Sequence, residues 1–222
     1  MKIPLATSAD PQQVMRLHET VTGRACVVVG SAPLPTPAAD VSDEEIVIAV
    51  NGGISSVLRV DVWVVASRSQ DKPGHAQIKP LHKTMLQQAT ARTVGHVILL
   101  RGPKDASEGA TLAALQQLSV RYSSWSVLDK PTKLWLETLL CARKADKPCS
   151  SGILATAAAL WCGASAVRLV GFSFTPGYHY ISKQRPAAWW RNHIPADQRA
   201  LRALQARYGS ALSGAILQQV AA

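Results

Sequence analysis

The sequence predicts an α/β protein made of a single Rossmann-like domain, with a mainly parallel sheet and helices on both faces. Short apolar runs rich in β-branched residues recur along the chain, and helix-like segments separate them. Continuous apolar runs are typical of strands buried on both faces, and their alternation with helices indicates a parallel sheet. The 222 residues, 47% of them hydrophobic, are enough for one core, so residues 1–222 are expected to form one domain.

Five apolar runs predict the strands, and most of them end in glycine or small polar residues. They are RACVVVG (24–30), EIVIAVNGG (45–53), VDVWVVASR (60–68), HVILLRGP (96–103) and AVRLVGFSF (166–174). The sequence predicts helices between and after these runs, at 75–92, 107–119, 131–145, 151–162 and 195–208. A short helix at Pro11–Thr20 is expected as a lead-in to the first strand.

Residues that directly follow the predicted strands form the candidate site, because ligands of open α/β sheets bind beyond the carboxyl ends of the strands. Glycine lets the backbone approach a ligand closely, and N–H groups at a turn bind phosphate well. Each turn by itself is better explained by glycine and asparagine simply ending a strand, but the common edge of the whole set favours one shared polar ligand. These nucleotide-binding candidates are Gly30, Ser31, Ala32, Pro33, Asn51, Gly52, Ser67, Arg68, Gly171, Phe172 and Ser173.

The start of the alanine-rich helix at 151–162 adds Ser150, Ser151 and Gly152 to these candidates. Small residues leave space there, and the first amides of a helix attract an anion. Serine is also among the best N-cap residues, so an ordinary capped core helix is the alternative explanation.

Several common nucleotide and hydrolase motifs are absent from the sequence. The first strand leads into G-S-A-P-L-P rather than G-x-G-x-x-G, and no G-x-x-x-x-G-K-[ST], Asp-x-Asp or G-x-S-x-G occurs. A dinucleotide oxidoreductase, a P-loop ATPase and a serine hydrolase are therefore not expected. The sequence predicts neither a bound cofactor nor a metal site.

The net charge of +10 favours anionic partners, which include phosphorylated small molecules, anionic lipids and nucleic acid. Nucleic acid is not the expected partner, because basic residues form no block of five and no RNA-binding motif occurs. The chain has no apolar stretch of about 18 residues and no apolar leader, so a cytoplasmic location is expected. The four cysteines are expected to be buried thiols, and the tryptophans at 63, 125, 135 and 161 to lie in the core.

The order of motifs resembles the bacterial sialyltransferases of glycosyltransferase family 42. The matching segments are VVVGSAP, VIAVNGG, SSGILATAAALWCGASAVRLVGFSF, GYHY and NHIPADQRALRAL, and together they span residues 24–210. The resemblance implies a variant of the GT-A fold with a small lid at about 175–195. It also implies metal-independent, inverting transfer of an acidic sugar from a CMP-activated donor to a glycan or glycolipid hydroxyl. Such an activity would suit lipopolysaccharide biosynthesis at the inner face of a membrane, with peripheral contact to anionic lipid.

By the same resemblance, His193 would be the general base that takes the proton of the acceptor hydroxyl. The family's two phosphate-binding tyrosines fall at Thr175 and at His179 or Tyr180, so at most one is kept. The family's arginine before Ser-Gly is also missing, and Lys183, Arg185 or Arg191 could neutralise the phosphate instead. Trp189 and Trp190 could stack on a sugar or a base, contact a membrane, or pack within the lid.

The alternative is a Rossmann-like nucleotide-binding protein, or an enzyme similar to the pterin pyrophosphokinases, without glycosyl transfer. The missing tyrosines favour this alternative, whereas the histidine directly before the last long helix favours the transferase. The donor sugar, the acceptor and a homo-oligomeric state are left open by the sequence.

Overall fold

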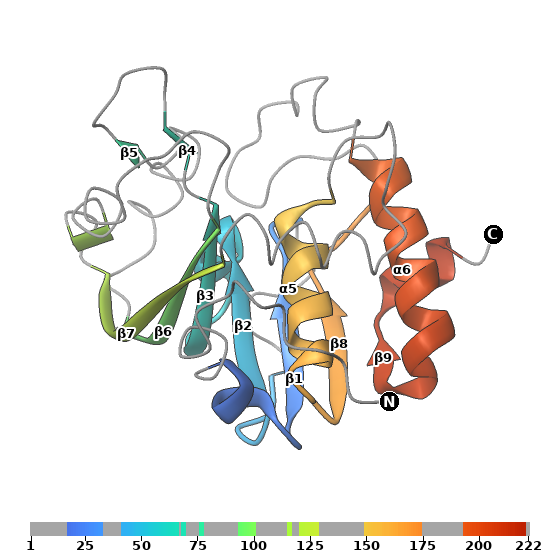
Figure 1. Ribbon diagram of the computed structural model, residues 1–222, viewed down its shortest axis with the longest axis horizontal. Helices are drawn as coiled ribbons and strands as arrows, with labels where there is room; N and C mark the ends of the chain where they lie inside the picture. The colour runs from blue at the N-terminus through green and yellow to red at the C-terminus, as the bar shows by residue number, and fades with distance from the viewer. Residues whose placement is uncertain are drawn as a thin grey trace, which may run out of the picture.

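The computed structural model describes residues 17–32, 41–66, 68–69, 76–77, 93–100, 115–116, 120–128, 149–174 and 193–220. Seven strands form one sheet, in which every described strand pair is parallel. Two helices, α5 (Ser151–Trp161) and α6 (Ile194–Tyr208), pack beside this sheet (Figure 1). The Rossmann-like α/β fold that the sequence predicts is therefore confirmed.

The strand order in the sheet is β7-β6-β3-β2-β1-β8-β9. The chain moves outward from β1 in one direction through β2, β3, β6 and β7, and then returns to place β8 on the other side of β1. The strands are β1 (Ala25–Val29), β2 (Ile46–Val50), β3 (Val60–Ala66), β6 (Thr93–Leu100), β7 (Arg121–Leu128), β8 (Ala166–Val170) and β9 (Leu212–Ser213). The carboxyl ends of β1 and β8 are thus the topological switch point, where open α/β sheets bind ligands.

Apolar layers cover both faces of the central strands, which explains their continuous apolar runs. In β1, Cys26 and Val28 belong to a cluster with α5 and α6, whereas Val27 and Val29 belong to a second cluster on the other face. The second cluster includes Ile54 of the 3-10 helix η1 (Asn51–Ser56) and Leu115 of the helical residues 115–116.

Helices α5 and α6 lie where the sequence predicts them, to within one residue at each end. In α5 every residue from 152 to 160 is buried, so this helix is part of the core and needs its small alanine side chains. Helix α6 is amphipathic: it begins with Pro195 in its first turn and ends before Gly209, whose φ is +53°. Both helices begin at the edge of the sheet where the parallel strands end (Figure 1).

Four strands were not expected from the sequence. Strand β7 lies at one edge of the sheet and alternates exposed and half-buried residues over its first half, so it lacks a continuous apolar run. Its Trp125 is 40% exposed, which corrects the expectation that this tryptophan belongs to the core. Strand β9 has only two residues, and two further short strands, β4 (Arg68–Ser69) and β5 (Ala76–Gln77), form a separate antiparallel ribbon. Most of the helices expected at 75–92, 107–119 and 131–145 fall outside the described residues.

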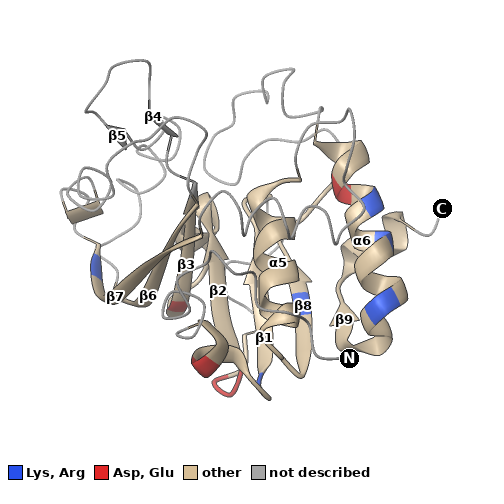
Figure 2. Ribbon diagram, viewed as in Figure 1, with Lys and Arg blue, Asp and Glu red and all other residues tan. Residues whose placement is uncertain are grey.

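Ion pairs form at the amino edge of the sheet, which is opposite the edge where the parallel strands end. Figure 2 shows several acidic residues of the described chain at this amino edge. The guanidinium of Arg168 in β8 donates to both carboxylate oxygens of Glu45, from Nε at 3.1 Å and from Nη2 at 2.7 Å. This bidentate hydrogen bond lowers the pKa of Glu45. The acidic residues 43–45, which directly precede β2, therefore lie at the end of the sheet remote from the candidate site.

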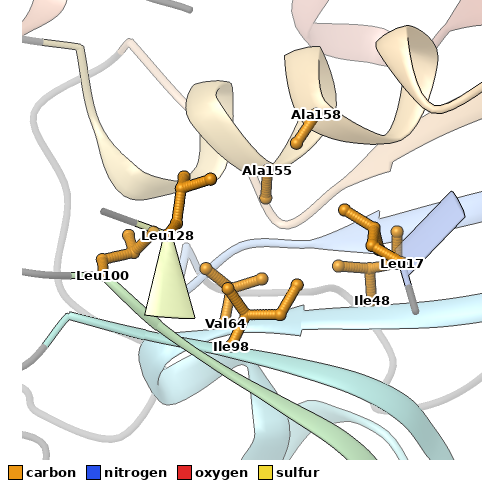
Figure 3. Close-up of a pocket in the computed structure, with 8 residues that line it drawn as sticks. All are labelled: Leu17, Ile48, Val64, Ile98, Leu100, Leu128, Ala155 and Ala158. Carbon is orange, nitrogen blue, oxygen red and sulfur yellow. The ribbon is translucent and has the colours of Figure 1, made fainter. Parts of the chain in front are cut away.

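An apolar cavity of about 20 Å³ lies between α5 and the sheet (Figure 3). Its lining side chains carry no polar atoms, so the cavity offers nothing that would hold a nucleotide. They are Leu17, Ile48, Val64, Ile98, Leu100, Leu128, Ala155 and Ala158. Cys26 and Cys162 are buried free thiols, as expected, and burial raises the pKa of each to about 12.

Candidate functional site

The turns that follow β1 and β8 are hydrogen-bonded to each other at the topological switch point. The N–H of Gly30 donates to the carbonyl of Val170 at 2.8 Å, and the N–H of Ala32 donates to the carbonyl of Gly171 at 2.9 Å. Two turns that are remote in sequence are therefore held as one rigid backbone surface. This surface is formed by residues that the sequence predicts to bind a nucleotide.

Close backbone packing explains the glycines at this point. A Cβ on Gly30 would collide with the carbonyl oxygen of Gly171, and a Cβ on Gly53 would collide with that of Val29. Gly171 has a φ of +70°, and a Cβ there would lie 2.8 Å from the carbonyl oxygen of Gly30. The ends of β1, β2 and β8 approach one another too closely for side chains at these positions.

The turn after β2 has an unusual backbone at Asn51. Its φ is +49°, and among the described residues it is the one residue other than glycine with a positive φ. Asparagine tolerates this conformation better than most residues do, and such strain is frequent at functional sites. Two contacts fix the turn: the indole Nε1 of buried Trp63 donates to the carbonyl of Asn51 at 2.9 Å, and the Ser31 hydroxyl donates to the carbonyl of Val50 at 3.4 Å.

The start of α5 packs against the turn after β8. A Cβ on Gly152 would lie 2.5 Å from Cε1 of Phe172, so the ring of Phe172 occupies the space that the missing side chain leaves. The Ser150 side chain makes no capping hydrogen bond to the helix backbone, so the ordinary serine N-cap proposed as the alternative is not present. The first amides of α5 thus lie beside Gly171 and Phe172, next to the switch point.

His193 is brought to the same end of the sheet by contacts between the starts of α5 and α6. It directly precedes α6, and its carbonyl accepts the N–H of Asp197 at 2.8 Å. The carboxylate Oδ1 of Asp197 in turn accepts the backbone N–H of Ser150 at 2.7 Å. The thiol of Cys149 also lies against this helix start, 3.9 Å from the carbonyl oxygen of Ala196.

Asp197 has a perturbed acidity in this position. It is 9% exposed, and burial raises its pKa from 3.8 to about 6, although hydrogen bonds from Ser150 and the nearby charge of His193 favour its ionised form. Asp197 is not among the site residues predicted from the sequence. A signal was present, because Asp197 shares one face of α6 with the apolar residues three, four and seven positions later, and an acid on a buried face needs a partner.

Most of the predicted nucleotide-binding residues lie in the turns after three neighbouring strands or at the start of α5. Gly30, Ser31, Ala32, Asn51, Gly52, Gly171 and Phe172 lie in the turns after β1, β2 and β8, with Ser150, Ser151 and Gly152 at the start of α5 and an exposed Ser173 after Phe172. Arg68 lies in β4, which pairs with β5 in the separate antiparallel ribbon. Pro33, Ser67, Thr175, His179 and Tyr180 lie outside the described residues, as does the expected lid except for its last three residues.

The remaining described histidines and acids support no second site. His96 is buried between two serine hydroxyls of β7, with Nδ1 2.8 Å from Ser124 and Nε2 2.8 Å from Ser126, so its role is structural. Within the described parts of the chain, no three histidine, cysteine or acidic side chains cluster in a way that could hold a metal ion. No helix of those parts combines the length and apolarity needed to cross a bilayer.

Comparison with known proteins gives a likeness in structure but not in sequence. No protein-family profile matches the chain, and no curated protein matches it in sequence. The monofunctional α-2,3-sialyltransferase Cst-I from Campylobacter jejuni has a similar structure, with a TM-score of 0.51 and 12% identity over 96% of this chain and 79% of that one. The sialyltransferase CstII from the same organism, in complex with the substrate analogue CMP-3FNeuAc, gives a TM-score of 0.49 and 10% identity over 87% and 81% of the two chains. The chain therefore has a fold similar to that of a bacterial sialyltransferase, as its order of motifs indicates.

Proposed function

We propose that this protein is a metal-independent, inverting glycosyltransferase that transfers an acidic sugar from a CMP-activated donor to a hydroxyl of a glycan or glycolipid. One observation carries the proposal: a continuous series of contacts joins the switch point of the sheet to the start of α5 and then to His193. The similar fold of a sialyltransferase and the net charge of +10, which suits an anionic donor, both support it.

The start of α5 suits the phosphate of the donor. The first intrahelical bond of α5 is donated by Leu154 to the carbonyl of Ser150, so the N–H groups of residues 151–153 have no acceptor inside the helix. These amides and the helix dipole favour an anion, and the glycine backbone at Gly30 and Gly171 lets the nucleoside approach closely. In this proposal Asn51 and Ser31 contact the cytidine part of the donor.

His193 acts as the base in the proposed reaction. The acceptor oxygen forms a bond to the anomeric carbon on the face opposite the phosphate, while the bond from that carbon to the phosphate oxygen breaks and CMP leaves with its electron pair. The acceptor hydroxyl gives its proton to the imidazole of His193, because a ring nitrogen of a neutral imidazole can act as a general base. Attack from the opposite face inverts the configuration of the sugar.

Thermal unfolding with added nucleotides and a transfer assay with CMP-sialic acid test the proposal. We expect CMP to raise the melting temperature while ATP, GTP and NAD do not, because a ligand that binds only the folded state stabilises it. The substitution His193→Ala should abolish transfer and leave the CMP-induced shift unchanged. The matched control is His18→Ala, since His18 lies at the other end of the sheet and bonds to Thr22.

Two outcomes would contradict the proposal. Transfer that survives His193→Ala would remove the base from the mechanism. A melting temperature that responds to ATP or GTP but not to CMP would favour the nucleotide-binding or pyrophosphokinase-like alternative.

A further inference from the structure

A single buried carboxylate connects the two helices that carry the proposed site. Oδ1 of Asp197 accepts the N–H of Ser150, directly before α5, while the N–H of the same residue donates to the carbonyl of His193, directly before α6. Ser150 and His193, which Asp197 joins through its side chain and its backbone N–H respectively, are 43 positions apart in the sequence. Asp197 is itself 9% exposed, so water does not compete strongly for these bonds.

The position of Asp197 gives its charge a specific environment. It lies in the first turn of α6 and beside the residue that precedes α5, so the amide ends of two helices point toward one carboxylate. Burial opposes this charge, and the helix ends and the Ser150 hydrogen bonds favour it. A buried carboxylate that is hydrogen-bonded by Ser150, on a residue whose backbone N–H is bonded to His193, has little freedom to move.

We propose that Asp197 is a positioning residue, which fixes the imidazole of His193 relative to the phosphate-binding start of α5. The proposal rests on the function proposed above. If α5 binds the phosphate and His193 takes the proton, the distance between them decides whether the acceptor oxygen can reach the anomeric carbon. A displacement of about 1 Å in such a geometry costs about 100-fold in rate.

The groups that face Asp197 also predict how it responds to a nucleotide. Within the described chain, these are His193, directly before α6, and Ser150, directly before α5. A phosphate bound at the start of α5 would add a negative charge close to the carboxylate, which raises its pKa. Nucleotide binding should therefore be coupled to proton uptake by Asp197.

Steady-state kinetics of two variants test the positioning role. The substitution Asp197→Ala removes the carboxylate, and we expect kcat per CMP-binding site to fall about 100-fold while KM for the donor changes less than about threefold. The substitution Asp197→Asn keeps an oxygen that can accept the Ser150 N–H, so it should restore most of kcat. The matched control is Gln205→Ala, an exposed residue of the same helix, which should leave both constants unchanged.

A merely structural role gives a different result. If Asp197 only packs α5 against α6, Asp197→Ala will lower the melting temperature and the number of CMP-binding sites but leave kcat per site unchanged, and this outcome overturns the proposal. If the unsubstituted protein binds CMP and transfers sugar, such a result counts against Asp197 alone. If the unsubstituted protein does neither, the proposed function fails and the positioning role fails with it.

A measurement on the unsubstituted protein covers the case in which Asp197→Ala does not fold. The carboxyl carbon of Asp197 can be titrated by NMR spectroscopy with and without CMP. We expect its pKa to rise when CMP binds, and also to rise in His193→Asn, because the charge of His193 lowers it. If CMP binds and the pKa of Asp197 does not change, the phosphate does not lie beside this carboxylate, and the proposal is overturned.

Discussion

Gly30 and Gly171 pack so closely, backbone against backbone, that a methyl group on Gly30 would overlap the carbonyl oxygen of Gly171. They come from the turns after β1 and β8, and the N–H of Gly30 donates to Val170 across the same contact. The gap between the turns after β1 and β8 at the switch point is therefore filled by the protein's own backbone. A ligand there meets a preformed surface of amides and carbonyls.

The substitution Gly30→Ala tests this surface. We expect it to lower the free energy of unfolding by about 1–3 kcal/mol, because the added methyl group forces the two turns apart, and to weaken CMP binding. Chemical unfolding and calorimetric titration with CMP measure the two effects. The control is Gly209→Ala, which has a positive φ but open space around it, so it should cost about 1 kcal/mol and leave CMP binding unchanged. Equal CMP affinity in Gly30→Ala would contradict the placement of the nucleotide.

The hydrogen bond from Trp63 to Asn51 gives a second prediction. Trp63→Phe removes the indole N–H that fixes the left-handed backbone of Asn51, while most of the buried ring remains. We expect a loss of about 1–2 kcal/mol in the free energy of unfolding and a weaker affinity for CMP, because the strained turn is no longer held. CMP binding should be measured by a method that does not rely on fluorescence, such as calorimetric titration, because the substitution removes a tryptophan. An unchanged affinity would show that Asn51 does not depend on this contact.

The raised pKa of Asp197 predicts how stability depends on pH. Its pKa is about 6 in the folded protein and 3.8 in the unfolded chain, so the folded state holds the proton more tightly. This contribution is fully present below pH 3.8 and is lost as the pH rises through about 6. Relative to Asp197→Asn, the unsubstituted protein should gain up to about 3 kcal/mol in free energy of unfolding as the pH falls from 7 to 4. Urea unfolding of both proteins between pH 4 and pH 7 tests this prediction. If the free energy of unfolding changes with pH equally in the two proteins, the prediction is wrong.

The ion pair between Arg168 and Glu45 has the opposite dependence on pH. The pKa of Glu45 is lowered by Arg168, so its stabilisation is present above the ordinary value of 4.5 and is lost as the pH falls through the folded value. We expect Glu45→Gln to cost about 1–3 kcal/mol at pH 7 and less in acid, with CMP binding unchanged because the pair lies at the amino edge of the sheet. The exposed neighbour Glu44 provides the matched control, Glu44→Gln. If the loss in free energy of unfolding caused by Glu45→Gln does not decrease in acid, the charge of Glu45 is not the source of that stabilisation.

The sequence predicted those parts of the fold whose local pattern agrees with their burial. Strands β1 and β2 have continuous apolar runs because both faces are covered, and α6 has a proline in its first turn and a glycine after its end. Strand β7 was missed because its polar alternation belongs to an edge strand, and β9 is too short to produce a pattern. These failures follow from tertiary position, which a local pattern does not contain.

The candidate site was predicted only as far as backbone turns reveal it. Glycines and small polar residues after strands identified the switch point, but the partner of Asp197 is Ser150, on a different helix. An acidic residue in the first turn of a helix is ordinarily explained by the helix dipole alone. Only the three-dimensional structure shows that this carboxylate links two helix ends.

The pairing of β1 with β8 has a consequence for synthesis of the protein. Residues 25–29 are made well before residues 166–170, yet the two segments are neighbours in the sheet. Until those emerge from the ribosome, β1 has an open edge of valines, which invites pairing with other chains. Truncations that end before residue 166 should therefore aggregate, and contacts between such distant segments make folding slow.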